Sequence, residues 1–237
     1  METFKTPLEA FSHWLQKDPD HIFLRQPINR KFIEYSRQET YDQALCIAGA
    51  LHNMGLKQGD PVALLSKNCA HWFMADLAIM LGGFISVPLY PTLDKDSINE
   101  ILIHSESKAV IVGKLDNYEA QRTGIPNIPK IGVSLYGVDE AYTWEDIVKT
   151  ATDFQPFEQH PEDLITIMYT SGTTGNPKGV MHKVKSFNQV INTGIEVLEI
   201  KNHSKMFSYL PLSHIAERIG IEMVGFYTGS TVSFPES

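Results

Sequence analysis

The stretch LITIMYTSGTTGNPKG, residues 164–179, joins an apolar run to a loop of small and hydroxyl-bearing residues. The apolar run has the composition of a buried strand. Glycines in the loop let the backbone approach a ligand closely, and successive backbone N–H groups can hold an anion. Lys178 adds a positive charge. The stretch therefore predicts a strand that ends in a phosphate-binding loop, and a flexible Gly/Ser/Thr linker is the alternative.

The spacing of the glycines excludes three well-known loops. A Walker loop requires GxxxxGK[ST], but the second glycine, counted from Gly172, would fall on Pro177. A dinucleotide-binding loop requires GxGxxG, whereas Gly172 is followed by Gly175. A nucleophile elbow requires GxSxG, and Tyr169 stands two positions before Ser171. The candidate phosphate ligands of this different loop are Thr170, Ser171, Gly172, Thr173, Thr174, Gly175 and Lys178.

Strand-like and helix-like segments alternate on both sides of this loop. Residues 60–68, 84–90 and 108–113 form apolar runs without polar alternation, which is typical of a parallel sheet buried on both faces. Amphipathic segments between them favour helices that cross over the sheet. The pattern predicts an α/β fold, with an open and mostly parallel sheet flanked by helices.

The expected elements can be placed from periodicity and from their boundary residues. Thr40 is a candidate N-cap for the second helix, and the phosphate loop is expected to lead through Lys178 into a helix. Between residues 115 and 161 the pattern weakens, with one short helix expected near residues 142–151. The other helices are expected over residues 7–17, 39–54, 70–83, 94–107, 185–200 and 212–229, and further strands over residues 32–35, 162–170, 205–211 and 231–234.

Composition and net charge limit the partners and the cellular location that can be expected. The chain has 237 residues with a net charge of −8, which argues against nucleic acid as the main partner because phosphate backbones require a basic face. Cys46 and Cys69 lie in apolar surroundings without CxxC spacing, as expected for reduced structural thiols. The N-terminal residues lack the apolar core of a signal peptide. We expect a cytoplasmic protein, with peripheral contact with the inner face of the membrane left open.

Three segments resemble one known family. IMYTSGTTGNPKG, residues 167–179, resembles the phosphate-binding signature of the AMP-binding, adenylate-forming enzymes, such as acyl-CoA synthetases. YLPLSHIAERIG, residues 209–220, is similar to the next core motif of that family in its long-chain fatty acyl-CoA synthetase form. ADLAIMLGGFISVPLYPTL, residues 75–93, resembles the segment that precedes the signature in the same subgroup. The resemblance extends from about Thr40 to the end of the chain.

The resemblance implies a reaction with ATP, Mg²⁺ and CoA. A fatty acid carboxylate would attack the α-phosphate of ATP, giving the acyl-adenylate and releasing pyrophosphate. The thiol of CoA would then displace AMP to form the thioester. Thr170 and the following loop would surround the β- and γ-phosphates, and Lys178 would order the loop or neutralise pyrophosphate. Such transfers depend mainly on positioning and charge stabilisation. The expected partners are therefore small molecules, and the oligomeric state stays open.

His214 is the catalytic candidate, because the family pattern places this position near the acyl carboxylate and the α-phosphate. The alternative is a histidine at a helix N-terminus that only caps or packs. A zinc site of His214 and Glu217 lacks further ligands nearby in the sequence, so no metal site is expected. A Ser213–His214 dyad is disfavoured because neighbours on a helix point apart. Arg218 is interpreted as a solvated charge of the helix.

The resemblance also implies what the 237 residues lack. The family's adenine-stacking segment with its Mg²⁺-binding Glu, its ribose-binding Asp and its C-terminal Lys have no counterpart before Ser237. Residues 1–237 are thus expected to be the N-terminal part of an AMP-binding domain, truncated and inactive alone. The substrate is expected to be a long-chain fatty acid. A medium-chain or aromatic acid-CoA ligase is the alternative, as is a non-catalytic nucleotide-binding or regulatory domain.

Overall fold

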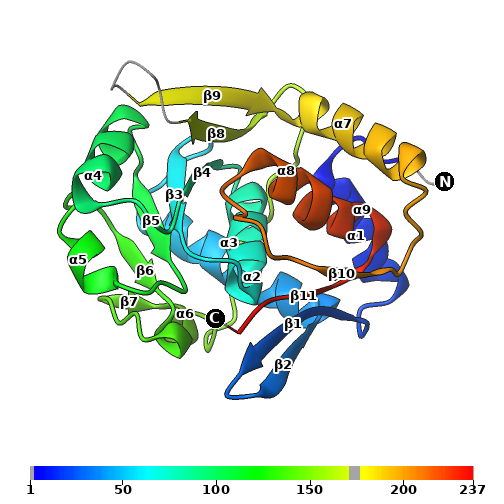
Figure 1. The fold of residues 1–237 in the computed structure, drawn as a ribbon, viewed down its shortest axis with the longest axis horizontal. Helices are drawn as coiled ribbons and strands as arrows, with labels where there is room; N and C mark the ends of the chain where they lie inside the picture. The colour runs from blue at the N-terminus through cyan, green and yellow to red at the C-terminus, as the bar shows by residue number, and fades with distance from the viewer. Residues whose placement is uncertain (1–2, 171–176, 237) are drawn as a thin grey trace.

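A computed structural model describes residues 3–170 and 177–236 of the chain. Within these residues the strands form one seven-stranded sheet and one four-stranded sheet. Figure 1 shows β9 along one edge of the molecule, beside α7, and the β1–β2 hairpin at the opposite edge. The strands are β1 (Ile22–Ile28), β2 (Lys31–Ser36), β3 (Pro61–Leu65), β4 (Ile85–Leu89), β5 (Ala109–Val112), β6 (Lys130–Gly132), β7 (Tyr142–Thr143), β8 (Leu164–Thr170), β9 (Lys178–Lys183), β10 (Lys205–Phe207) and β11 (Thr231–Ser233).

The larger sheet has the strand order β7-β6-β5-β3-β4-β8-β9. All neighbouring strands in it run parallel except β8 and β9, which form an antiparallel pair. In the smaller sheet, of order β10-β11-β1-β2, only β1 and β2 are antiparallel among the described strands. The prediction of an open, mostly parallel α/β sheet with flanking helices is confirmed.

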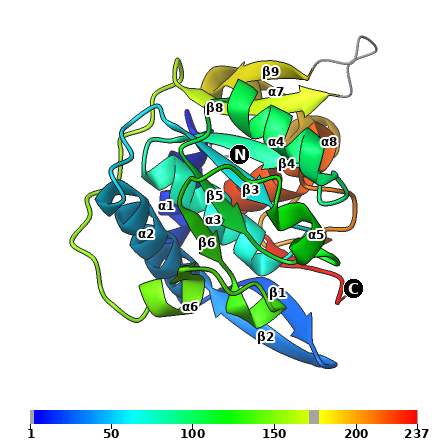
Figure 2. The ribbon, with the colours of Figure 1, turned by 90° about the vertical axis from the view of Figure 1, so that its left-hand side faces the viewer.

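Helices cover both faces of the larger sheet. Val62 and Leu64 of β3 pack into the cluster that contains α2 and α3, whereas Ala63 and Leu65 pack against α4 and α5. Figure 2 shows α4 and α5 on one side of the sheet and α2 on the other. The helices are α1 (Pro7–Lys17), α2 (Arg37–Asn53), α3 (Ala70–Leu81), α4 (Lys95–His104), α5 (Tyr118–Arg122), η1 (Ser134–Tyr136), α6 (Trp144–Ile147), α7 (Val184–Val197), α8 (Ile215–Glu217), η2 (Arg218–Met223) and α9 (Val224–Thr228).

The start of α2 and the segment before α7 differ from the expected boundaries. Helix α2 begins at Arg37, and its N-cap is Ser36 rather than Thr40. The Ser36 hydroxyl accepts the Glu39 N–H while the Glu39 carboxylate accepts the Ser36 N–H, a capping box that satisfies two N–H groups at the helix start. Strand β9 lies between the phosphate loop and α7, so Lys178 begins a strand and does not lead directly into a helix.

The helical run over residues 215–228 has a π-helical middle. It comprises α8, the π-helix η2 and α9 without a break, and it ends at Gly229, whose φ of 61° is a left-handed conformation that glycine adopts without strain. Cys46 is half-buried, Cys69 is buried, and neither forms a disulfide. Among the described residues, no helix combines the length and apolar character needed to cross a bilayer.

Candidate functional site

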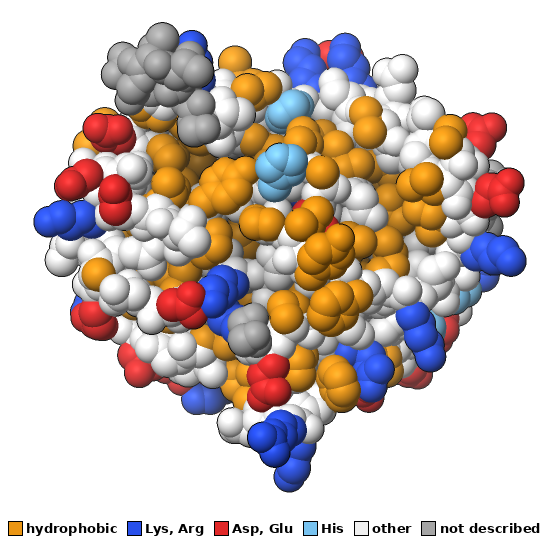
Figure 3. Space-filling view, in the orientation of Figure 1, with side chains coloured by type: hydrophobic (Ala, Val, Ile, Leu, Met, Phe, Trp, Pro, Cys, Tyr) orange, Lys and Arg blue, Asp and Glu red, His pale blue; other side chains and the backbone are white. Residues whose placement is uncertain are grey.

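A cavity of about 850 Å³ lies at the carboxyl ends of β4 and β8. This is the edge at which open α/β sheets bind their ligands. Figure 3 shows the molecule from the side of Figure 1, where hydrophobic side chains gather around histidines in the middle of the face. The lining residues are Pro88, Leu89, Tyr90, Thr92, Leu93, Ser97, Glu100, Ile101, Met168, Tyr169, Thr170, Pro177, Val180, His182, Ser213, His214 and Ile215.

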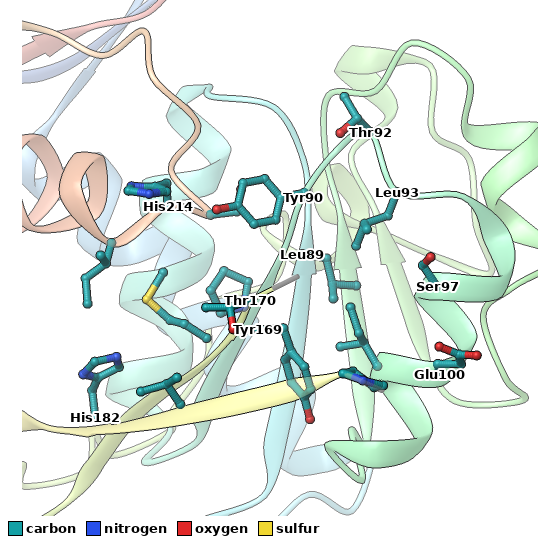
Figure 4. Close-up of a pocket in the computed structure, with 17 residues that line it drawn as sticks. Leu89, Tyr90, Thr92, Leu93, Ser97, Glu100, Tyr169, Thr170, His182 and His214 are labelled. Atoms are coloured by element: carbon teal, nitrogen blue, oxygen red, sulfur yellow. The ribbon is translucent and has the colours of Figure 1, made fainter. Parts of the chain in front are cut away.

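The cavity brings together the segments that the sequence analysis selected. Figure 4 shows His214 and Tyr90 on one side of Thr170, and Glu100 of α4 on the far side. Thr170 and His214, two of the predicted site residues, line the same cavity although they lie in different motifs. Its walls are mainly apolar, with a few polar groups directed inward, which is the usual composition of a small-molecule site.

The β8–β9 hairpin forms one wall, and its register decides which side chains share a face. Thr170 pairs with Lys178, and Thr166 pairs with His182. Since side chains two apart on a strand share a face, both pairs lie on the same face of the hairpin. Lys178 is exposed at the start of β9 and is not among the lining residues. The other predicted phosphate ligands, Ser171, Gly172, Thr173, Thr174 and Gly175, lie outside the described residues.

His214 is exposed and serves as the N-cap of the helical run. Its Nδ1 accepts the N–H of Ala216 at 3.2 Å, so the capping role that the sequence analysis considered is present. The same imidazole lines the cavity, which leaves its Nε2 edge for a ligand. Ser213 is buried, in contrast to its exposed neighbour. The two roles of His214 are thus compatible in one geometry.

The segment before His214 is fixed by a buried asparagine. Nδ2 of Asn68 donates to Ser208 Oγ at 2.8 Å and to the Leu210 carbonyl at 2.6 Å, while its Oδ1 accepts the Leu212 N–H at 3.0 Å. The Glu217 carboxylate accepts from the Ser208 hydroxyl at 2.9 Å and from the Tyr209 N–H. Burial raises the pKa of Glu217, and these hydrogen bonds oppose the rise. Glu217 therefore orders the segment that precedes His214.

Arg218 is the clearest departure from the sequence analysis. It is fully buried and not a solvated helix charge. Its guanidinium donates to both carboxylate oxygens of Asp76 at 2.8 and 2.7 Å, and to Thr166 Oγ1 at 2.6 Å. An arginine in a helical sequence is usually solvated, and only the tertiary structure brings Asp76 of α3 to this one.

His182 is a cavity residue that the sequence analysis missed. It is half-buried on β9, and both burial and the nearby charge of Arg218 lower its pKa, so the ring is neutral near pH 7. A neutral imidazole can both donate and accept hydrogen bonds. Strand alternation over residues 178–183 is the signal that would place His182 on the Lys178 face, but this strand was not predicted.

Tyr169 joins the cavity to α4. Its hydroxyl forms a 2.7 Å hydrogen bond with Nδ1 of His104, and burial raises the pKa of the phenol. Across the part of the chain that the structure describes, no three His, Cys, Asp or Glu side chains are arranged to hold a metal ion. The described lining of the cavity offers hydroxyl, imidazole and apolar contacts and the carboxylate of Glu100.

Comparison with known proteins decides the family. Residues 11–237 match the family described as AMP-binding enzyme. The chain belongs to the AMP-binding enzyme family. Its similarity to this family covers the strands and loops that line the cavity, including both segments that carry Thr170 and His214.

Named relatives of this AMP-binding chain are long-chain acyl-CoA synthetases. It is 32% identical over 227 residues to long chain acyl-CoA synthetase 4 of Arabidopsis thaliana, covering 86% of the chain and 34% of that protein. It is 31% identical over 255 residues to long chain acyl-CoA synthetase 5 of the same plant, covering 95% of the chain and 38% of that protein. The chain thus spans about a third of the length of these curated relatives.

Solved structures share the fold of this AMP-binding chain. The structure of the anthranilate CoA ligase AuaEII in complex with anthranoyl-AMP aligns with a TM-score of 0.86 and 22% identity. The alignment covers 100% of the present chain and 46% of the AuaEII chain. The N-terminal domain of FACL13 from Mycobacterium tuberculosis aligns with a TM-score of 0.82 and 23% identity. The alignment covers 99% of the present chain and 58% of the FACL13 chain. At these identities the likeness concerns the fold alone.

Proposed function

We propose that this protein takes part in the ATP-dependent activation of a long-chain fatty acid, first to the acyl-adenylate and then to the acyl-CoA thioester. The observation that carries the proposal is the shared cavity of Thr170 and His214. One residue lies where the signature leaves β8, and the other lies in the acyl-CoA synthetase-like motif. Membership of the AMP-binding family and the names of the relatives support the same reaction.

In this proposal, some residues bind the anionic groups of the substrates and others position the reacting groups. Thr170, the following loop and Lys178 would hold the phosphates of ATP through N–H, hydroxyl and ammonium donors. His214 would donate a hydrogen bond between the acyl carboxylate and the α-phosphate, where negative charge accumulates as the two anions approach. The apolar walls at Leu89 and Met168 would exclude water from the mixed anhydride. The CoA thiol would then attack the acyl carbon and release AMP.

Mg²⁺ would enter with ATP as part of the substrate. The described residues do not provide a ligand set for it, since no suitable cluster of carboxylates lines the cavity. Glu100 is the only acidic side chain among the described lining residues, and a single carboxylate is not a metal site. No step is therefore assigned to a metal held by these residues.

The proposal is tested with the natural full-length protein. ATP–pyrophosphate exchange with palmitate measures adenylation, and acyl-CoA formation measures the second step. We expect Lys178→Ala to raise the KM for ATP at least tenfold, because it removes a charge from the phosphate loop. Lys149→Ala is the matched control, since Lys149 is an exposed lysine remote from the cavity that pairs with Asp146.

A comparison of three carboxylic acids as substrates tests which class of acid the protein activates. Palmitate, octanoate and benzoate are compared as substrates at equal concentration. A preference for palmitate supports a long-chain acid, whereas a preference for octanoate or benzoate assigns the protein to a different acid-CoA ligase. Absence of exchange with every acid, in a protein that is folded by circular dichroism, would contradict the proposed function.

A further inference from the structure

Three structural elements, α3, β8 and η2, meet at the side chain of Arg218. Nη2 donates to both oxygens of Asp76 on α3, and Nη1 donates to Thr166 Oγ1 on β8. Nε lies 3.6 Å from Glu222 Oε2, one turn along the same helical run. Arg218, Asp76 and Glu222 are all fully buried. This is an ion-pair cluster without access to solvent, at the back of the cavity wall.

Two carboxyl groups, those of Asp76 and Glu222, lie beside the guanidinium of Arg218. Burial, followed by the neighbouring charge of Asp76, raises the pKa of Glu222 well above its ordinary value. This shift favours the neutral form of Glu222, and the guanidinium makes its hydrogen bonds to Asp76. The planar fork of Arg218 against Asp76 fixes both the distance and the angle between the π-helix η2 and α3.

Stability alone does not account for such a cluster. Removing two charges from water is unfavourable, and well-packed apolar side chains of similar volume often stabilise a core equally well. What an apolar replacement does not reproduce is directional bonding. Arg218 makes three hydrogen bonds in one plane to two different elements, so it defines their relative position more narrowly than packing does.

The elements that Arg218 joins are those that carry the site. Thr166 lies four residues before Thr170 on β8, and its hydroxyl also donates to the Ser86 carbonyl of β4 at 2.8 Å. On the other side, the Arg218 N–H donates to the His214 carbonyl at 3.1 Å. A continuous set of hydrogen bonds thus runs from the backbone of His214 through Arg218 to the two strands that end at the cavity.

We propose that Arg218 is a positioning residue that sets the separation of His214 from Thr170 by holding Thr166 on β8 and Asp76 on α3. This inference rests on the proposed function, because it assigns a purpose to that separation. His182, paired with Thr166 and close to the charge of Arg218, lies on the same face of the hairpin and would move with it.

Thr166 offers a cleaner test than Arg218, whose replacement would leave buried carboxylates unpaired. Thr166→Val keeps the shape and removes the hydroxyl, whereas Thr166→Ser keeps the hydroxyl. Thr228→Val is the matched control, because Thr228 is an equally buried threonine whose hydroxyl donates to a backbone carbonyl, that of Val224, away from the cavity. All four proteins are compared as full-length chains.

Two readouts separate positioning from stability. The first is amide hydrogen exchange of β8 and β9, which requires no substrate. The second is the affinity for MgATP and the kcat for adenylation of palmitate. We expect Thr166→Val to increase exchange in β8–β9 and to lower kcat roughly three- to tenfold, the effect of about one hydrogen bond. Thr166→Ser should restore both, and Thr228→Val should change only the melting temperature.

The outcomes distinguish this inference from the proposed function. If wild-type protein neither binds MgATP nor forms acyl-adenylate, the proposed function fails, and the exchange data still report whether Arg218 and Thr166 hold the hairpin. If wild-type protein is active but Thr166→Val matches Thr228→Val in exchange and kcat, Arg218 contributes to packing only and the inference is wrong.

Discussion

The imidazole of His214 both caps a helix and lines the cavity. Nδ1 accepts the Ala216 N–H and thereby caps the helical run, while the ring lines the cavity that contains Thr170. Because capping uses one nitrogen, the tautomer that carries the proton on Nε2 is the one that fits the structure. A hydrogen-bond donor is then directed away from the helix, as an anion at the proposed reaction centre requires.

Two substitutions separate these roles of His214. Asparagine is a preferred N-cap, so His214→Asn should keep the free energy of unfolding within about 0.5 kcal/mol of wild type, whereas His214→Ala should lose about 1 kcal/mol. Both should lower the kcat for adenylation at least tenfold, because neither side chain carries the imidazole N–H that would donate to the reacting anions. Urea unfolding and pyrophosphate exchange measure the two effects. If the kcat of His214→Asn equals that of wild type, His214 serves only as the N-cap of the helical run.

Residues whose role is local could be predicted from the sequence, and residues whose role depends on distant partners could not. Thr170 and His214 were selected from the motifs that contain them, and the structure places both at one cavity. Arg218 was misassigned because its partner Asp76 lies 142 positions away in the chain. His182 was missed because the strand that orients it was not recognised.

At the scale of elements, strands β3, β4, β5 and β8 of the larger sheet were predictable, and β6, β7 and β9 were not. The continuous apolar runs of β3, β4 and β5 have the pattern of strands buried on both faces, and these strands are confirmed. Strand β9 is largely exposed and has the sequence KGVMHK. Its strand conformation depends on pairing with β8 rather than on its own composition.

Asn68 shows how one side chain holds an element in place. It follows β3 and makes three hydrogen bonds to the segment that leads from β10 to His214. Asn68→Ala should leave the buried Leu212 N–H unpaired, which costs roughly 1–3 kcal/mol, and it also removes the hydrogen bonds to the buried Ser208 hydroxyl and the Leu210 carbonyl. We therefore expect a loss of about 2–4 kcal/mol in the free energy of unfolding, measured by urea titration.

A second asparagine provides the comparison for Asn68. Asn99 on α4 donates one hydrogen bond, to the Gly124 carbonyl at 3.0 Å, and it is half-buried. Asn99→Ala should therefore cost about 1 kcal/mol or less, since water can replace the lost partner. Equal losses for the two variants would show that the three hydrogen bonds of Asn68 do not order the segment.

For the molecule as a whole, the helices on the two faces of the larger sheet create two interiors of different polarity. Among the described residues, the buried polar side chains beside α4 and α5 include Ser105, Ser107 and Gln121, which are uncharged, while the side of α3 contains buried His71, Asp76 and Glu222. His71 lies among Tyr35, Tyr136 and Trp144 with its Nδ1 3.1 Å from the Tyr136 hydroxyl. Burying titratable groups makes the stability of the entire fold depend on pH.

His71 determines the sign of one part of that dependence. Burial lowers the pKa of His71 from 6.5 to about 3, so the folded protein keeps the ring neutral. Between these values the unfolded chain binds a proton that the folded protein does not, and stability falls as the pH falls. The slope is about 1.4 kcal/mol per pH unit. The raised pKa of Glu222 acts in the opposite direction, so only a comparison of variants isolates His71.

His71→Phe keeps an aromatic ring in the buried site and removes the titration. Between pH 7 and pH 5, wild type should therefore lose about 2 kcal/mol more of its free energy of unfolding than the variant does, as measured by urea titration. His52→Phe, at an exposed position on α2, controls for the loss of a histidine as such and should follow wild type. Parallel pH profiles for wild type and His71→Phe would mean that the folded protein protonates His71 without opening its core, and the closed packing around this ring would then be wrong.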